Sequence, residues 1–132
     1  MFAPFRGTQR NRDHVAVRYV EPMQVRLTTT GRVSGEPREV TLYAFPDGER
    51  LVVVGSRGGA ATDPAWVRNL RADPHATIRR GRTVEAVRAR EVDGAERDRL
   101  WRLVCDAFPL YATYQRRTSR RIPVFVLEPA GE

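Results

Sequence analysis

The chain has 132 residues, about the length of one domain, and its 23 Lys and Arg against 16 Asp and Glu give a formal net charge of +7. All 23 cations are arginine, which we interpret as coding bias in a GC-rich genome rather than selection for nucleic-acid binding. The single cysteine, Cys105, excludes an internal disulfide, and residues 1–14 lack the apolar stretch of a secretory signal. We therefore expect a cytoplasmic protein with a flexible basic arm at 1–14 and one domain at 15–132.

Six segments are predicted to be β-strands. In most of them apolar and polar residues alternate, as in a strand with one buried face, whereas 51–54 is apolar on both faces and is expected at the centre of a sheet. Glycine and proline mark a loop at 31–37 and a turn at 46–48. The predicted strands cover residues 24–30, 39–44, 51–54, 75–79, 83–92 and 122–127.

Three helices are predicted from their apolar spacing and from the residues at their ends. Asp63 is expected to cap the first helix, with Pro64 at its first position. Asp93 and Glu96 have the spacing of a capping box at the start of the second helix. The predicted helices cover residues 65–72, the stretch after Asp93 through Ala107, and residues 110–118.

This order of elements predicts a mainly β protein with flanking helices. Most of the strands follow one another through short turns, which favours antiparallel pairing. Strands and helices do not alternate, so a doubly wound fold is not expected. A curled sheet of about six strands that closes into a small barrel would remove its exposed edges.

The sequence offers little to a self-sufficient catalyst. Its two histidines, His14 and His75, lie in the arm and at a strand start, and no G-x-S-x-G elbow is present. One cysteine and two distant histidines give no metal-ligand spacing, and Cys105 is interpreted as a small buried hydrophobe. Neither a Walker A motif nor a dinucleotide fingerprint occurs.

Two glycine-rich loops are candidates for anion binding. Arg32 and Arg38 flank the loop 31–37, where glycine lets the backbone approach a ligand and guanidinium groups suit a phosphate. The second loop, Ser56-Arg57-Gly58-Gly59, leads to the start of a helix with free N–H groups. The alternative is that both loops are simple turns whose arginines are solvated.

Three aromatic residues form a further candidate element. Tyr111 and Tyr114 are three positions apart in the last predicted helix, which places both hydroxyls on one face. Such phenols can donate a hydrogen bond or a proton to a developing oxyanion, and Trp66 can provide a stacking surface. The alternative is a packed aromatic edge of the barrel.

Taken together, these segments resemble the deazaflavin-dependent nitroreductase family, whose members bind coenzyme F420 on a split β-barrel of the FMN-binding split-barrel superfamily. The matching segments fall in order and cover nearly all of residues 27–129. They are LTTTGRVSGEPR (27–38), LVVVGSRGGA (51–60), DPAWVRNLRADP (63–74), YATYQRRT (111–118) and IPVFVLEP (122–129).

The resemblance implies a set of cofactor-binding residues and a set of residues near the electron acceptor. The coenzyme's phosphate and ribityl region is implied to contact Arg32, Val33, Ser34, Arg38, Glu39, Val40, Thr41, Leu42 and Tyr43. The rest of the coenzyme, its ring included, is implied to contact Val54, Gly55, Ser56, Arg57, Ala65, Trp66, Val67, Arg68, Asn69 and Tyr111. Tyr111, Tyr114 and Ser56 are the implied catalytic residues, which orient or protonate the acceptor, and no metal is implied.

The implied reaction is hydride transfer from the reduced deazaflavin to a quinone, a nitroaromatic or an activated enone. The cofactor carries the redox chemistry, so the chain needs to supply only binding, orientation and charge stabilisation. Val33, Arg57, Val67 and Phe108 depart from residues common in the family and put the identity of the acceptor in doubt. The arginines at 116, 117, 120 and 121 could meet the coenzyme's glutamate tail, although a solvated patch is the favoured interpretation.

Two other functions remain open from the sequence. The same barrel could bind FMN, with the Gly-Arg loop holding its terminal phosphate. A basic nucleic-acid-binding barrel is the alternative from another class, but acidic residues are interspersed throughout and no paired aromatic platform is evident. A small-molecule acceptor is therefore the expected partner. We expect no membrane association, and a homodimer through the strand near 38–45 is left open.

Overall fold

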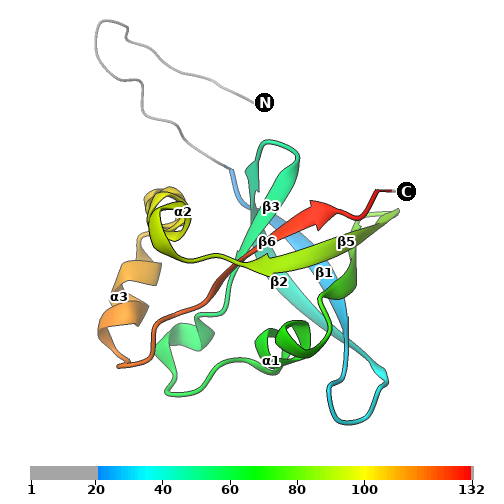
Figure 1. Cartoon of the computed structure of the whole chain (residues 1–132). Coiled ribbons are helices and arrows are strands. Elements are labelled where there is room, and N and C mark those ends of the chain that lie inside the picture. Colours follow the sequence, from blue (N-terminus) through cyan, green and yellow to red (C-terminus); the bar gives the residue numbers. More distant parts are fainter. Residues whose placement is uncertain (1–20, 132) are drawn as a thin grey trace, which may run out of the picture.

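The computed structural model describes residues 21–131, which form one six-stranded antiparallel barrel with three flanking helices (Figure 1). The strand order is β1-β2-β3-β6-β5-β4, and β4 pairs with β1 to close the barrel. The predicted fold class is confirmed; the predicted arm at 1–14 lies outside the described residues. The strands are β1 (Met23–Thr30), β2 (Pro37–Asp47), β3 (Arg50–Val54), β4 (His75–Arg80), β5 (Thr83–Glu91) and β6 (Val124–Pro129).

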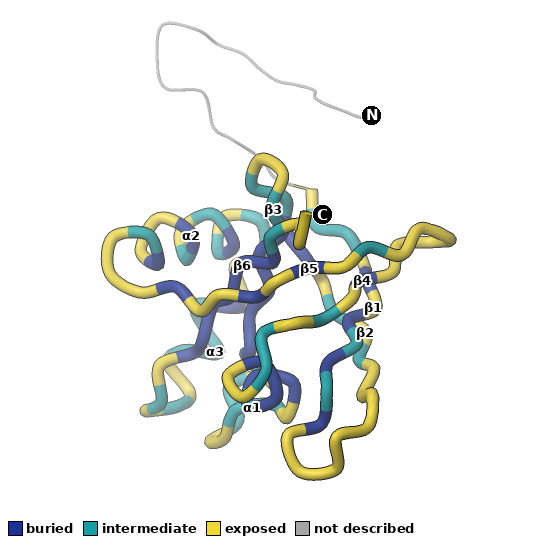
Figure 2. Tube along the Cα trace, turned by 45° about the vertical axis from the view of Figure 1, so that its right-hand side comes forward, coloured by how far each residue is buried: buried dark blue, intermediate teal, exposed yellow. Residues whose placement is uncertain are grey.

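The strand β3 explains why one segment of the sequence is apolar on both faces. Leu51 and Val53 point into the barrel, whereas Val52 and Val54 belong to a second core between the sheet and the helices. Pairing of β3 with β6 places it inside the sheet, as the sequence predicted. Figure 2 shows β3 and β6 as the most continuously buried strands, while the β1–β2 loop is exposed.

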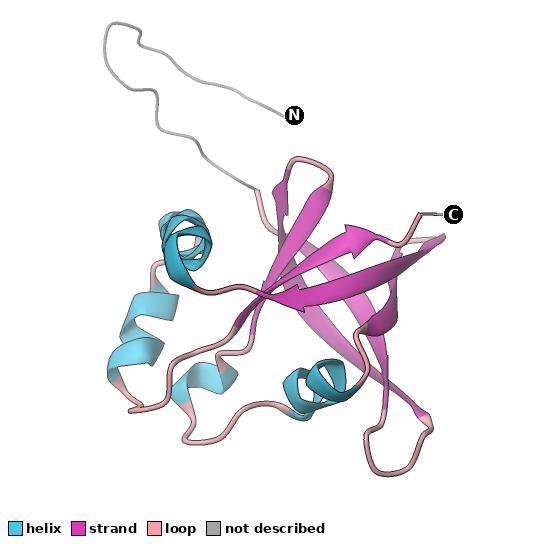
Figure 3. Ribbon diagram, in the orientation of Figure 1, coloured by secondary structure: helices cyan, strands magenta, loops and turns pink. Residues whose placement is uncertain are grey.

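The helices are α1 (Ala65–Ala72), α2 (Gly94–Ala107) and α3 (Leu110–Arg116), and a single 3-10 turn, η1, covers Arg57–Gly59. α2 and α3 pack in the second core with Val52 and Val54, whereas α1 packs in the core inside the barrel and lies apart from α2 (Figure 3). None of the helices in residues 21–131 has the length and apolar character that a bilayer span requires.

Both predicted helix caps are wrong in detail. Pro64 is the N-cap of α1, with an extended ψ of 155°, and the Asp63 carboxylate instead accepts from Arg120 and Arg71. Asp93 does precede α2, but its side chain forms no capping hydrogen bond. The Glu96 carboxylate is held by Arg90 and Arg50 instead of returning to the helix start. In both cases arginines that are distant in sequence compete with the backbone for the carboxylate.

A divergence between two strands opens the barrel at one end. Residues 37–44 of β2 pair with β1, but β2 pairs with β3 only through Phe45, Pro46 and Asp47. The first half of β2 therefore moves away from β3. The β1–β2 loop, η1 and the start of α1 lie at this end of the molecule (Figure 1). This opening positions the candidate site.

Candidate functional site

Two neighbouring cavities occupy the open end of the barrel. The larger, of about 710 Å³, lies between the β1–β2 loop, the start of β2 and α1, and we call it the arginine cavity. The smaller, of about 400 Å³, lies between β2, the end of β3, η1 and α3, and we call it the aromatic cavity. Val40, Arg57, Pro64 and Trp66 line both, so the two cavities form a single cleft.

The cleft brings together most of the site residues that the sequence predicted. Gly55 and Val67 line neither cavity, because both are buried in packed parts of the chain. The predicted residues that line the arginine cavity are Arg32, Val33, Ser34, Arg38, Glu39, Val40, Arg57, Ala65, Trp66, Arg68 and Asn69. Those that line the aromatic cavity are Val40, Thr41, Leu42, Tyr43, Val54, Ser56, Arg57, Trp66, Tyr111 and Tyr114.

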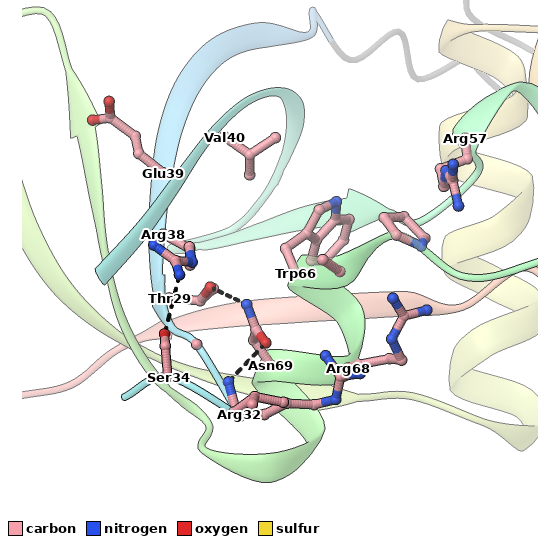
Figure 4. Close-up of a pocket in the computed structure, with 14 residues that line it drawn as sticks. Thr29, Arg32, Ser34, Arg38, Glu39, Val40, Arg57, Trp66, Arg68 and Asn69 are labelled. Atoms are coloured by element: carbon pink, nitrogen blue, oxygen red, sulfur yellow. Dashed lines mark hydrogen bonds between the residues drawn. The ribbon is translucent and has the colours of Figure 1, made fainter. Parts of the chain in front are cut away.

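Four arginines, at positions 32, 38, 57 and 68, make the arginine cavity strongly cationic. None of them forms an ion pair with another residue of the described range 21–131. Glu39 is the acidic residue of the lining, and its carboxylate lies 3.4 Å from Arg26. Figure 4 shows Arg38 and Arg57 at opposite ends of the cavity with Trp66 between them. The lining is therefore complementary to an elongated anion.

A buried pair of polar side chains fixes the loop that carries Arg32. The Asn69 Nδ2 donates to Thr29 Oγ1 at 3.1 Å, and Asn69 Oδ1 accepts from the Arg32 backbone N–H at 3.0 Å (Figure 4). Both side chains are almost fully buried, so their mutual hydrogen bonds are needed. Thr29 was not among the predicted site residues. The sequence feature that could have identified Thr29 is its position in β1, where a polar residue stands on the same buried face as Val25 and Leu27.

The loop is also too tight for a side chain at Gly31. A Cβ there would lie 2.7 Å from Ser34 Oγ and 3.2 Å from the Glu36 carbonyl. Ser34 Oγ in turn accepts from Arg38 Nη2 at 3.2 Å and from the Glu36 N–H at 3.1 Å. Ser34 thus orients one of the cavity's arginines.

Arg68 carries the one orphaned polar atom of the described residues. Its Nε is buried and has no hydrogen-bond partner, while its Nη1 donates to the Asp63 carbonyl at 2.7 Å. An unpaired, desolvated donor of a guanidinium group costs free energy unless an acceptor reaches it. Arg68 lines the arginine cavity, so its positive charge adds to the attraction of the cavity for an anion.

The turn between the two cavities has an unusual backbone. Arg57, Gly58 and Gly59 have successive φ angles of 44°, 62° and 84°. Glycine adopts such angles freely, whereas the left-handed region costs an arginine on the order of 1 kcal/mol. A Cβ at Gly59 would lie 2.7 Å from the Tyr114 carbonyl, so η1 packs directly against α3. Arg57 Nη1 donates to Thr62 Oγ1 at 2.8 Å.

The two predicted phenols meet in the aromatic cavity. The rings of Tyr111 and Tyr114 are 6.3 Å apart, and Tyr111 also packs edge-on against Phe108 at 4.8 Å. Tyr111 is only 6% exposed, and burial raises the pKa of its hydroxyl to about 12. The hydroxyl therefore stays protonated at neutral pH, as a hydrogen-bond donor requires.

Several side chains differ from the roles that the sequence indicated. Trp66 is mostly buried against Phe125, with ring centroids 5.9 Å apart, and only part of the indole borders the cleft. Arg120 belongs neither to a solvated patch nor to a tail-binding surface, because its guanidinium is buried against the turn at 55–63. Cys105 was predicted to be a small buried hydrophobe; it packs against the second core but is only half-buried, and this burial raises the pKa of its thiol.

The fold and the cleft define a small β-barrel protein with a cationic cavity, complementary in charge to an elongated anion, next to a cavity lined by two phenols. Comparison with known protein families identifies the family to which this chain belongs. The model of the family described as F420H(2)-dependent quinone reductase matches residues 6–129. F420H(2)-dependent quinone reductase Rv1261c of Mycobacterium tuberculosis (strain ATCC 25618 / H37Rv) is 38% identical over 109 residues, which cover 80% of this chain and 73% of the relative.

The chain belongs to the F420H(2)-dependent quinone reductase family. The predicted enzyme class, an F420-dependent reductase, is thereby confirmed at the level of the family.

Solved structures agree with this family and with the barrel. A structure described as F420-H2 Dependent Reductase (FDR-A) matches with a TM-score of 0.74 at 38% identity, over 85% of this chain and 99% of that chain. A second structure, described as a domain-swapped dimer, also has a TM-score of 0.74 and 38% identity, and covers 82% of this chain and 81% of that chain. HutZ of Vibrio cholerae matches at 14% identity with a TM-score of 0.63 over 83% and 82% of the two chains, which shows the shared fold alone.

Proposed function

We propose that this protein binds coenzyme F420 across the cleft and transfers a hydride from its reduced form to a quinone. The observation that carries the proposal is the continuity of the cleft. Arginines that form no ion pair among residues 21–131 line one end, and a protonated phenol lines the other. Nitroaromatics and activated enones are acceptors of the same kind, since each gains negative charge on oxygen when it takes up hydride.

The residues of the arginine cavity fit the anionic part of this coenzyme. Its phosphodiester requires guanidinium donors, and Arg32, Arg38 and Arg57 offer them without a competing carboxylate among residues 21–131. The guanidinium of Arg68, which also lacks a carboxylate partner among residues 21–131, adds a fourth positive charge to the lining. The absence of a side chain at Gly31 lets the Ser34 hydroxyl and the loop backbone lie close together at the rim.

When bound, the coenzyme would supply the hydride from its reduced ring, and the chain supplies binding, orientation and a hydrogen-bond donor. The arginines hold the phosphate end, and Trp66 and Val40 lie where the two cavities join, which is the natural place for the ring. Tyr111 then keeps its hydroxyl proton and donates a hydrogen bond to the acceptor oxygen as charge develops there. Leu42, Val54 and Phe108 line the same cavity and reduce the access of water.

The proposal is tested by binding and turnover of the purified protein. Calorimetric titration with oxidised F420, with FMN and with a short DNA duplex separates the three functions that the sequence left open. We expect saturable binding of F420 and reduction of a soluble quinone by F420H2. Preferential FMN binding would support the alternative cofactor. Tight DNA binding with a steep salt dependence would support the nucleic-acid alternative.

We further propose that two copies of the chain pair in solution. A related structure is described as a domain-swapped dimer. Tyr43, on the β2 strand that the sequence singled out, is 55% exposed. Light scattering coupled to size exclusion measures the mass directly, and a monomeric mass across the micromolar range would contradict this proposal.

A further inference from the structure

The side chain of Arg120 forms an unusually complete set of hydrogen bonds. It is only 13% exposed and lies on the connection between α3 and β6. Its Nε donates to the Ala60 carbonyl at 2.7 Å, and its Nη2 to the Ser56 carbonyl at 2.8 Å. Its Nη1 donates to the Gly55 carbonyl at 3.1 Å and to Asp63 Oδ1 at 2.6 Å. All four acceptors belong to the segment 55–63, which we call the strained segment.

Other contacts of the strained segment involve its two ends or single side chains: the Gly55 N–H donates to the Pro123 carbonyl at 2.9 Å, and Arg57 Nη1 donates to Thr62 Oγ1 at 2.8 Å. Within it, the Gly59 N–H donates to the Ser56 carbonyl at 2.8 Å, and the Ala60 N–H donates to the Arg57 carbonyl at 3.0 Å. Arg57 is the one non-glycine residue with a positive φ among residues 21–131. A backbone conformation of this kind persists only where the surroundings enforce it. The fork of Arg120 supplies that enforcement, because its three nitrogens face four acceptors at once.

The strained segment borders both cavities. Ser56 and Arg57 line the aromatic cavity, and Arg57 also lines the arginine cavity. Asp63, which pairs with Arg120, accepts through its backbone carbonyl from Arg68 Nη1 at 2.7 Å. The Arg120–Asp63 ion pair is therefore linked to Arg68 through the Asp63 carbonyl, and it lies in the same segment as Arg57.

The backbone of Arg120 is anchored to the helix that carries the phenols. Gln115, in α3, donates through Nε2 to the Arg120 carbonyl at 2.8 Å, and its Oε1 accepts from the Ile122 N–H at 2.9 Å. Tyr111 and Tyr114 lie in the same helix. The guanidinium of Arg120 thus connects the phenol side of the cleft to the arginine side.

We infer that Arg120 is a positioning residue, which acts through the strained segment to set the distance and angle between the anion-binding arginines and the phenols. The identity of the ligand in this inference rests on the proposed function. The link that Arg120 makes between α3 and the strained segment does not depend on it. A lysine at this position would keep the charge and lose the fork, since one ammonium group cannot reach acceptors that three guanidinium nitrogens contact. Arg120→Lys is therefore the informative variant.

The first measurement is hydrogen exchange of the protein without ligand. In Arg120→Lys we expect faster exchange at the Gly59 and Ala60 amides, while amides of the β3–β6 pairing keep their protection. Arg121→Ala is the matched control, because Arg121 is the exposed neighbour in sequence and lines neither cavity. Unchanged exchange in the turn, or faster exchange throughout the barrel, would overturn the inference.

The second measurement is quinone reduction with saturating F420H2. We expect kcat to fall about 100-fold in Arg120→Ala, the size of effect that a misplacement of reacting groups by about 1 Å produces. Added guanidinium ion is expected to restore part of that loss in Arg120→Ala and to leave the wild type unchanged. A loss that guanidinium does not restore, with hydrogen exchange in the turn unaltered, would show that Arg120 has no positioning role.

Asp63→Asn provides a second variant that keeps the three carbonyl contacts of Arg120 and removes its ion pair, together with the ion pair between Asp63 and Arg71. We expect a smaller fall in kcat than in Arg120→Ala, because only one of the four contacts of Arg120 is weakened. An equal fall would assign the whole effect to the ion pair and would contradict a role for the three carbonyl contacts. If the wild type neither binds F420 nor reduces a quinone, the proposed function fails. The exchange of the Gly59 and Ala60 amides in Arg120→Lys still decides the positioning role in that case.

Discussion

Replacement of Arg38 by alanine measures how much the arginine cavity contributes to coenzyme binding. The Arg38 guanidinium donates to the neutral Ser34 Oγ at 3.2 Å and forms no ion pair with a residue in 21–131, so its other donors are open to a phosphate. A hydrogen bond to a charged partner contributes about 1.5–3 kcal/mol. At 1.4 kcal/mol for each factor of ten, Arg38→Ala should raise the Kd for F420 by about 10- to 150-fold.

The assay is calorimetric titration with F420 at two ionic strengths. Arg38 is exposed, and the screening length falls from about 8 Å at 0.15 M salt to about 3 Å at 1 M, so the difference between variant and wild type should shrink at high salt. Arg82→Ala is the control, because it removes the same charge from the β4–β5 turn, outside both cavities. Arg32→Ala should act in the same direction as Arg38→Ala. Equal Kd values for Arg38→Ala and Arg82→Ala would refute the phosphate site.

Three further predictions concern the aromatic cavity and the framework around it. Tyr111→Phe should lower kcat for a quinone more than it weakens F420 binding, because the change removes only the hydroxyl that faces the acceptor in the proposed function. Steady-state kinetics and calorimetry measure the two effects. Equal turnover by the variant and the wild type would show that Tyr111 is a packing residue. Glu96→Gln should lower the free energy of unfolding at neutral pH by about 1 kcal/mol, a value discounted for solvent exposure. The reason is that hydrogen bonds from Arg90 and Arg50 lower the pKa of the Glu96 carboxyl from 4.5 to about 2. Because the folded pKa is the lower one, this stabilisation is present above pH 4.5 and is lost as the pH falls toward 2, so urea denaturation curves of Glu96→Gln and wild type should converge there. Gly55→Ala should destabilise the protein by about 1–3 kcal/mol, as overpacking does, because the added Cβ would lie 2.6 Å from Val67 Cγ2; an unchanged thermal midpoint would contradict this.

The predicted strands agree closely with the observed ones because each has a burial pattern that its own residues dictate. Alternation along 24–30 is the alternation of the inside and the outside of the barrel, and the apolar run at 51–54 reflects two cores. The predicted N-cap role of Asp63 was wrong for a different reason. Residue type and spacing show that a carboxylate can cap a helix, but they do not show that Arg120 and Arg71 reach it first.

The contrast between local patterns and contacts of distant residues also explains which parts of the candidate site the sequence predicted. The glycine-rich loops and the phenol pair were evident from residue type and spacing, and the structure brings them to one cleft. Thr29 was missed and Arg120 was assigned to a solvated patch, although both stabilise segments that border the cleft. Their importance depends on partners 40 and 57 positions away, Asn69 and Asp63, and no local pattern reports such a distance.

Residue type and local spacing were sufficient to predict a basic, antiparallel barrel with two glycine-rich loops and two phenols on one face of a helix. These properties depend on the hydrophobicity, backbone freedom and spacing of residues close together in the chain. Which arginines are available to a ligand depended on folding. Carboxylates from distant segments pair with Arg50, Arg71, Arg90 and Arg120, whereas the arginines at 32, 38, 57 and 68 form no such pair within residues 21–131. The strength of an ion pair depends on separation in space, and the barrel's closure sets that separation.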